Sequence, residues 1–243
     1  MSKITSRFTW FVALLASTSA ARANILANGD FELQPFWGAG LAGDAGFTLV
    51  SGAQIPGWTI EAGHGVTVHN TALYPTISGN YSINLDGEGY GAVNADLYQD
   101  FPSQTCGTYA LTFDWKGWYV TAQPRMDITI TDLVTGEEVA HVNFGSDQRL
   151  HHEVVGFTGT GHELRLRIRE NPESGVNDNA FILDNVSVEL LPRGNPDINA
   201  DGHVDAMDLA ILLGQWGGCG GDLNQDGTTN ARDLAVLLGA WTG

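Results

Sequence analysis

The chain has few basic residues, few cysteines and no long apolar run. Its 243 residues contain 11 Lys and Arg against 28 Asp and Glu, which gives a formal net charge of -17. A nucleic-acid-binding protein neutralises phosphates with a basic surface, so this composition excludes nucleic acid as a partner. Disorder is also disfavoured, because 43% of the residues are hydrophobic and can form a core. The composition therefore predicts an acidic globular protein of one or two domains.

The N-terminal apolar run is too short to span a membrane. Basic residues precede an apolar stretch at 8–16, and small residues lead to an A-x-A site at 21–23. This pattern is typical of a secretory signal peptide, whereas a membrane-spanning helix needs roughly 20 apolar residues. We expect residues 1–23 to be removed, and the mature chain to be secreted or held at the cell surface without a membrane span.

Cysteine is limited to Cys106 and Cys219. An exported protein enters an oxidising compartment, but these two residues fall in what the composition suggests are different domains. We expect two unpaired thiols, although the sequence alone does not decide the pairing. Neither cysteine belongs to a C-x-x-C motif, so a cysteine metal site is not expected.

Residues 24–192 carry the pattern of an all-β domain. Short runs that alternate apolar and polar residues are separated by Gly, Asn, Asp and Pro. The expected strands include 110–115, 126–131, 164–169 and 181–190. Such alternation, broken by frequent turns, indicates antiparallel strands in a sandwich or barrel.

One expected strand places a carboxylate among apolar residues. Asp184 has the same parity as Ile182, Val186 and Val188, so regular alternation would point it towards the buried face. An unpaired buried charge is unfavourable. We therefore expect Asp184 to be hydrogen-bonded, protonated or metal-bound; a capped edge or a bulge that turns it to solvent is the alternative.

Four motifs occur in a fixed order within this domain. They are N-G-D-F-E at 28–32, I-P-G-W-T at 55–59, Y-x-L-x-F-D at 109–114 and L-D-N-V-S-V at 183–188. Together they resemble galactose-binding-like jelly-roll modules of the DUF642 / choice-of-anchor C type. The resemblance implies an extracellular jelly-roll β-sandwich that binds polysaccharide. It also implies a structural calcium between the first and last strands, with Glu32 and Asp184 as ligands.

Aromatic side chains are the candidates for contacts with sugar rings, because their faces stack on the apolar side of a pyranose. The expected platform consists of Trp115, Trp118 and Tyr119, and the residues behind it are Trp37, Tyr90 and Tyr98. Core packing is the alternative for any aromatic residue in a sandwich, and we assign Trp58 to it. Trp115 and Trp118 differ in parity, so at most one of them can face the core from a regular strand.

The C-terminal residues contain an acidic repeat. The pattern D-x-N-x-D-G-x-x-[DN]-x-x-D occurs at 197–208 and again at 222–233. Calcium takes oxygen ligands from positions 1, 3, 5, 7, 9 and 12 of such a loop, and position 7 contributes a backbone carbonyl. The expected ligands of two Ca²⁺ ions are Asp197, Asn199, Asp201, His203, Asp205 and Asp208, then Asp222, Asn224, Asp226, Thr228, Asn230 and Asp233. The first loop has more carboxylates and is expected to bind calcium more tightly.

An apolar stripe follows each loop at helical spacing. Leu209, Leu212, Leu213 and Trp216 are repeated 25 residues later by Leu234, Leu237, Leu238 and Trp241. Each unit is half of an EF-hand, and we expect the two stripes to bury each other in a tail that folds only with metal.

Residues 197–243 resemble a type I dockerin, joined to the sandwich by a linker at 193–196. The resemblance implies a cohesin-like or other surface protein as partner. A standard cohesin is disfavoured, because Ala206-Met207 and Ala231-Arg232 replace the usual hydroxyl residues at loop positions 10 and 11.

Signatures of catalysis are missing from the sequence. There is no H-E-x-x-H and no G-x-S-x-G motif. The sequence therefore favours an exported non-catalytic module that binds glycan and calcium. A glycoside hydrolase and a structural surface or matrix protein remain the alternatives, because a pair of catalytic carboxylates needs only proximity in space.

Overall fold

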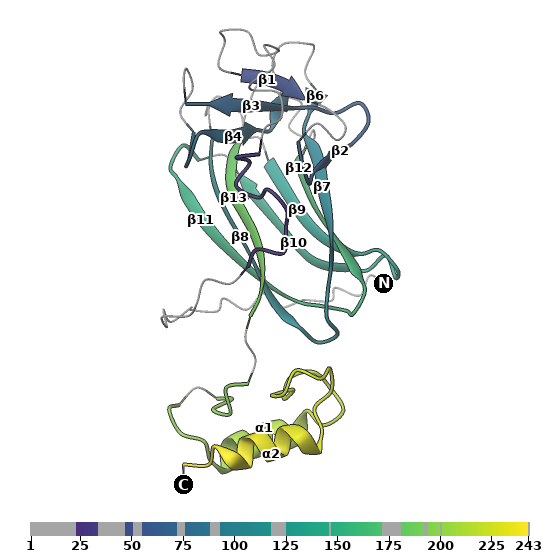
Figure 1. The fold of residues 1–243 in the computed structure, drawn as a ribbon, viewed down its shortest axis with the longest axis vertical. Helices are drawn as coiled ribbons and strands as arrows, with labels where there is room; N and C mark the ends of the chain where they lie inside the picture. Colours follow the sequence, from purple (N-terminus) through teal and green to yellow (C-terminus); the bar gives the residue numbers. More distant parts are fainter. Residues whose placement is uncertain are drawn as a thin grey trace, which may run out of the picture.

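The structure is a computed structural model of the chain and forms a β-sandwich followed by a small helical tail (Figure 1). It describes residues 23–33, 47–50, 55–71, 76–87, 93–117, 125–145, 147–171, 181–191, 194–199 and 201–242. Within these residues, no helix has the length and apolar character needed to cross a membrane.

The strands lie in two large antiparallel sheets and one short pair. In chain order they are Phe47–Val50 (β1), Thr59–Ile60 (β2), Val66–Asn70 (β3), Tyr81–Asn84 (β4), Asp86–Gly87 (β5), Val93–Asn94 (β6), Asp96–Pro102 (β7), Thr108–Gly117 (β8), Arg125–Asp132 (β9), Glu138–Gly145 (β10), His151–Thr158 (β11), Glu163–Asn171 (β12) and Phe181–Leu190 (β13). The six-stranded sheet has the order β1-β3-β4-β13-β8-β11, and the five-stranded sheet has the order β10-β9-β12-β7-β2. β5 pairs with β6.

The two large sheets enclose one apolar core. Alternate residues of long strands such as β12 and β13 face inward, so that Leu166 of the five-stranded sheet and Leu183 of the six-stranded sheet both belong to the core. The strands expected at 110–115, 126–131, 164–169 and 181–190 are confirmed as parts of β8, β9, β12 and β13. The mainly β architecture predicted from the alternation is therefore present.

A bulge in β13 explains the unusual parity of Asp184. The register with β8 shifts between Asp184 and Ser187, and Asn185 has a left-handed φ of 52°. The extra residue reverses the alternation, so Leu183 and Val186 face the core while Asp184 lies on the opposite face of the sheet. The bulge given as the alternative is present, but it does not turn Asp184 to solvent, because the side chain is 0% exposed. The expectation that Asp184 is hydrogen-bonded is confirmed.

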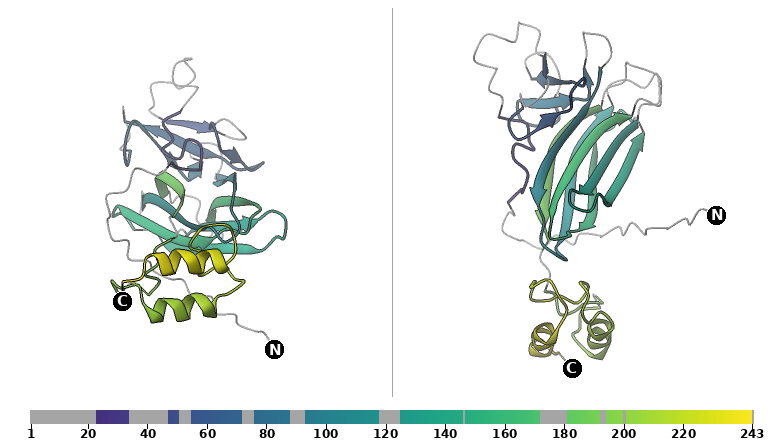
Figure 2. Two further views of the ribbon diagram at one scale, coloured as in Figure 1. Left: turned by 60° about the horizontal axis from the view of Figure 1, so that its bottom comes forward. Right: turned by 90° about the vertical axis from the view of Figure 1, so that its right-hand side faces the viewer.

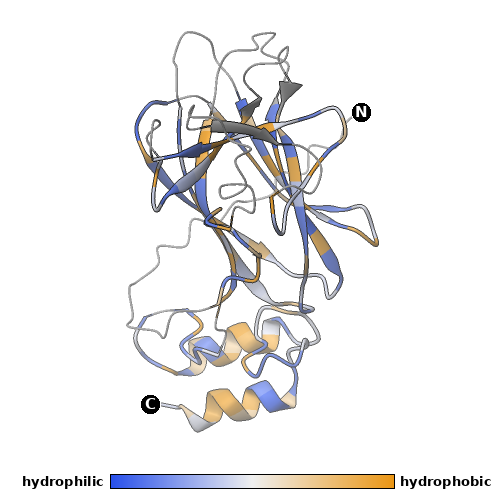
Figure 3. Cartoon of the chain, turned by 45° about the horizontal axis from the view of Figure 1, so that its top comes forward, coloured by the Kyte–Doolittle hydropathy of each residue, from blue (hydrophilic) through white to orange (hydrophobic). Residues whose placement is uncertain are grey.

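The tail contains two helices that lie side by side, Ala206–Gly214 (α1) and Ala231–Gly239 (α2) (Figure 2). Each begins at a capping box, with Asp205 and Asn230 as the N-cap residues. Both helices carry apolar segments (Figure 3), and Leu212 and Leu237 are fully buried between them.

The expectation that the two complete stripes bury each other is wrong. Leu213, Trp216, Leu238 and Trp241 are 51%, 49%, 52% and 40% exposed. Helices of nine residues are too short to bury the whole pattern, and each tryptophan lies beyond the last helical residue. Only the central turn of each stripe is buried.

The expectation of two unpaired thiols is also wrong. Cys106 and Cys219 form a disulfide with their Cα atoms 5.0 Å apart, although 113 residues separate them in the chain. Cys106 lies in the turn between β7 and β8, and Cys219 lies between α1 and the second acidic loop. The bond therefore joins the sandwich to the tail.

Candidate functional site

Both acidic loops fold into the same compact turn. Backbone N–H groups at loop positions 5 and 6 donate to the two oxygens of Asp197, at 3.1 and 2.9 Å. In the second loop the matching groups donate to Asp222 at 3.1 and 2.8 Å. Gly202 and Gly227 occupy position 6 with φ values of 91° and 95°, a conformation that glycine adopts without a steric penalty. The repeated sequence thus produces a repeated backbone geometry.

The last predicted ligand of each loop also caps the following helix. Asp208 and Asp233 are fully buried, and each accepts a hydrogen bond from the backbone N–H of its N-cap residue, at 2.9 Å from Asp205 and 2.7 Å from Asn230. The hydrogen bond from Asp205 lowers the pKa of Asp208 most, and further backbone N–H groups of the loop lower it as well. An ionised oxygen donor is thereby held at the end of the first loop.

The other predicted ligands lie along the loop backbone. The side chains of Asn199 and Asn224 donate to Asp201 and Asp226 at 2.9 and 3.1 Å. His203 and Thr228, at position 7, are exposed, and only their carbonyl oxygens are predicted ligands. Asn230 Nδ2 donates to the carbonyl oxygen of Thr228 at 2.9 Å.

Three carboxylates of the second loop lie close together, whereas no three of the described carboxylates of the first loop lie equally close. One oxygen each from Asp222, Asp226 and Asp233 lies within 4.8 Å of the others. No other group of three acidic, His or Cys side chains among the described residues meets this spacing, the four carboxylates of the first loop included. Hydrogen bonds from Asn224 and other neighbours lower the pKa of Asp226. Ionised, closely spaced oxygen donors fit a hard divalent cation such as calcium.

A second candidate surface covers the outer face of the five-stranded sheet. Arg165 and Arg167 alternate with core residues along β12 and each makes a bidentate ion pair with β7. Arg165 donates to Asp100 at 2.7 and 2.8 Å, and Arg167 donates to Asp96 at 2.6 and 2.7 Å. The guanidinium of Arg165 lies 3.8 Å from the centre of the Tyr98 ring. We call these five residues the arginine face.

Charge on the arginine face is internally balanced. Asp96 and Asp100 neutralise the two arginines, and Glu61 Oε2 lies 3.6 Å from Arg167. Planar side chains held in this way present oriented donors and acceptors with little net positive charge. From the sequence, Tyr98 is expected only behind the main aromatic platform, and the ion pairs are not predicted. The matching alternation of Asp96-x-Tyr98-x-Asp100 with Arg165-x-Arg167 was the available signal.

Trp115 is the one residue of the expected aromatic platform that lies within the described residues, and it does not form an exposed platform. Trp115 is 2% exposed and stacks on His151, with ring centroids 4.4 Å apart. Its Nε1–H donates to Glu153 at 3.3 Å. The prediction that Trp115 offers a free face to a sugar ring is therefore wrong, because its position on β8 points into the core. Trp118, Tyr119, Trp37 and Tyr90 lie outside the described residues.

Glu32 and Asp184 fix the two sides of one turn before β4. Glu32 accepts the backbone N–H groups of Asn80 and Tyr81 at 2.7 and 2.9 Å. Asp184 accepts the backbone N–H of Ser78 at 2.9 Å and the hydroxyl of Ser82 at 3.0 Å, and burial raises its pKa to about 6. These donors give both carboxylates a structural role, and a calcium ion at Glu32 and Asp184 stays a prediction.

Three of the four ordered sequence motifs meet at one seam. Trp58 is buried and its Nε1–H donates to the carbonyl of Asn28 at 3.1 Å, so its predicted packing role is confirmed. Val186 N–H donates to the carbonyl of Gly29 at 2.8 Å. A Cβ on Gly29 would lie 1.8 Å from the Val186 oxygen. The motifs at 28–32, 55–59 and 183–188 thus anchor the N-terminal segment to β13. Asn28, Gly29 and Asn185 also line an open depression of about 390 Å³ there.

Comparison with solved structures finds similarity at low sequence identity. An arabinose-bound α-L-arabinofuranosidase, MgGH51, is 11% identical, with a TM-score of 0.50. The matched region covers 81% of this chain and 30% of the arabinofuranosidase chain. The enzymatically active domain of tailspike protein 4 from bacteriophage CBA120 is 16% identical with a TM-score of 0.43 and covers 69% and 21%. TmCBM61 in complex with β-1,4-galactotriose is 12% identical with a TM-score of 0.44 and covers 70% and 99%.

The likeness to the arabinofuranosidase concerns the fold alone. The chain spans about a third of the arabinofuranosidase and about a fifth of the tailspike protein. No curated protein matches the sequence. The model of a family described as a protein of unknown function (DUF642) matches residues 24–189, which are most of the chain and nearly all of the sandwich. The chain therefore belongs to the DUF642 family.

Proposed function

We propose that the chain is an exported, non-catalytic, calcium-dependent protein whose sandwich binds a polysaccharide and whose dockerin-like tail attaches it to a partner. The observation that carries the calcium part is the set of carboxylates from Asp222, Asp226 and Asp233, which lie within 4.8 Å in a loop with the spacing of a calcium site. The first loop has the same backbone hydrogen bonds to its position 1 aspartate as the second loop. We infer one Ca²⁺ ion in each loop.

Calcium would supply charge neutralisation and a link between the two ends of each loop. The ion would be held by the predicted side-chain oxygens and by the carbonyl oxygens of His203 and Thr228. Among the described residues of the tail, the core contains four buried apolar side chains: Val204, Leu212, Leu223 and Leu237. So small a core favours a tail whose folding depends on the metal.

A neutral polysaccharide is the ligand that the arginine face supports best. Its arginines are paired with aspartates, so an anionic glycan would have to compete with Asp96 and Asp100 for them. The strongly acidic composition opposes anionic ligands as well. Sugar hydroxyls can instead hydrogen-bond to the guanidinium N–H groups and carboxylate oxygens that the ion pairs leave available. Trp118 and Tyr119 remain candidates for stacking on the sugar.

The tail is proposed to attach to a cohesin-like or other surface protein. Met207 is 62% exposed, and the Arg232 side chain is 79% exposed. These residues stand at the positions where hydroxyl side chains are usual, so the contact chemistry must differ from that of a standard cohesin complex.

Affinity electrophoresis tests the glycan proposal. The wild type, Arg167→Ala and Arg149→Ala are run through gels containing neutral polysaccharides or polygalacturonate. Arg149 is a suitable control, because it pairs with Asp147 away from the arginine face and is largely exposed. We expect retardation by a neutral polysaccharide, a loss of at least about tenfold in affinity for Arg167→Ala, and no change for Arg149→Ala. Equal retardation of the two variants contradicts this site, and release of reducing sugar favours the hydrolase alternative.

A further inference from the structure

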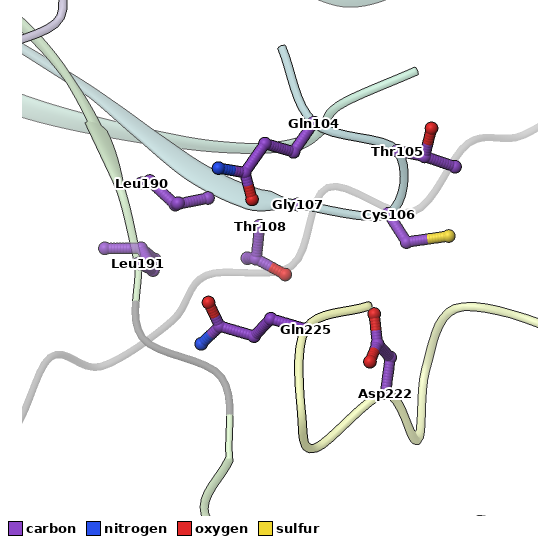
Figure 4. A pocket seen from close by; sticks show the side chains of 9 residues that line it. All are labelled: Gln104, Thr105, Cys106, Gly107, Thr108, Leu190, Leu191, Asp222 and Gln225. Atoms are coloured by element: carbon purple, nitrogen blue, oxygen red, sulfur yellow. The ribbon is translucent and has the colours of Figure 1, made fainter. Parts of the chain in front are cut away.

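The second acidic loop lies directly against the sandwich (Figure 4). Its Asp222 and Gln225 line a cavity of only about 10 Å³ together with Gln104 and Thr105 of the β7–β8 turn. The sulfur of Cys106 lies 3.2 Å from the carbonyl oxygen of Gly227 at loop position 6. The volume matches a single water at most, so the turn and the loop are closely packed.

The disulfide ends at the start of the same loop. Cys219 precedes Asp222, the position 1 ligand, by three residues, and Asp222 N–H donates to the Cys219 carbonyl at 3.4 Å. On the other side of the loop, a Cβ on Gly227 would lie 3.7 Å from Thr105. The loop is thus held at both sides by the segment 104–107 and by the covalent bond.

The first loop has no such support among the described contacts. Its polar contacts beyond its own residues reach the linker and the tail, from Asp197 N–H to Asn195 at 3.2 Å and from Val204 N–H to Thr242 at 2.8 Å. Asp197 is half-buried, whereas its counterpart Asp222 is 3% exposed. Two loops with the same acidic repeat pattern therefore lie in two different environments.

We propose that Cys106 and Cys219 are positioning residues for calcium in the second loop, and that their disulfide raises the calcium affinity of this loop while leaving the first loop unchanged. The proposal rests on the calcium binding proposed above. A free loop must be ordered when it takes up the ion, and that ordering lowers affinity. A loop already held against the sandwich by a covalent bond loses less freedom on binding. Reduction of the disulfide would then weaken one of the two sites.

Calorimetric calcium titrations of the full mature chain separate the loops. Asp201→Ala disables position 5 of the first loop and leaves the second as reporter; Asp226→Ala is the matched reverse. Each of these two single-loop variants is also made without the disulfide, by the double substitution Cys106→Ser and Cys219→Ser. With the second loop as reporter, we expect loss of the disulfide to lower calcium affinity roughly tenfold. With the first loop as reporter, we expect a change of less than about twofold.

Chemical reduction of the two single-loop variants provides a second arm if the serine variant does not fold. Equal calcium affinity of the second loop with and without the disulfide overturns the positioning role alone. An equal loss at both loops also overturns it, because that result shows general destabilisation of the tail. Absence of calcium uptake by the oxidised wild type overturns the calcium function itself, together with this proposal.

Discussion

Single residues at the seam between the N-terminal segment and β13 have little freedom to change. Gly29 approaches the backbone of Val186 so closely that a side chain cannot fit, and Asn185 adopts the left-handed conformation that makes the bulge. The family motifs therefore mark positions with steric and conformational demands. Their spacing in the sequence identifies the fold, and the polysaccharide site that we propose, on the arginine face, lies elsewhere.

Gly29→Ala tests this steric demand. Because the new Cβ would lie 1.8 Å from the Val186 oxygen, we expect the free energy of unfolding to fall by roughly 2–4 kcal/mol. Gly156→Ala is the matched control, since no atom lies within 4 Å of the Cβ that it adds. Urea unfolding of both variants measures the difference. Similar midpoints for the two variants would show that the seam can move aside.

At the scale of elements, period-two alternation was sufficient to predict β8, β9, β12 and β13. It could not predict the parity within β13, because a bulge adds one residue and reverses every later side chain. The acidic loops and their helices followed from a repeated motif, in which each residue type has a separate steric or ligand role. The burial between the helices was overestimated, because the sequence pattern continues past the points where the helices end.

The link between β13 and the turn before β4 should depend on pH. Burial raises the pKa of Asp184 to about 6, from an ordinary value of 3.8. The folded state therefore favours the protonated form, and the resulting stabilisation is complete below about pH 4 and lost as the pH rises through 6. Relative to Asp184→Asn, we expect the wild type to lose about 1–3 kcal/mol of unfolding free energy between pH 4 and 7.

Urea unfolding at pH 4, 5.5 and 7 checks the pH dependence. Asp30→Asn, at an exposed position, serves as the control and should keep the wild-type profile. Parallel stability profiles for the wild type and Asp184→Asn would mean that Asp184 has no part in the pH dependence.

At the scale of the whole molecule, the sequence indicated two parts but not their connection. Cys106 and Cys219 are 113 residues apart, and no local pattern reports which distant turns meet. The arginine face was missed for the same reason, because its ion pairs form between β7 and β12, about 65 to 71 residues apart. Local motifs predicted the acidic loops and the strands, whereas contacts between distant segments required the structure.

A calorimetric calcium titration of the oxidised mature chain at neutral pH tests the central claim, that the tail is a pair of calcium sites. We predict uptake of two ions per chain, with dissociation constants on the order of 10⁻⁴ to 10⁻³ M, and a gain of helical circular dichroism over the sample in chelator. Absence of uptake at millimolar calcium, or equal helicity in chelator and calcium, would contradict the claim.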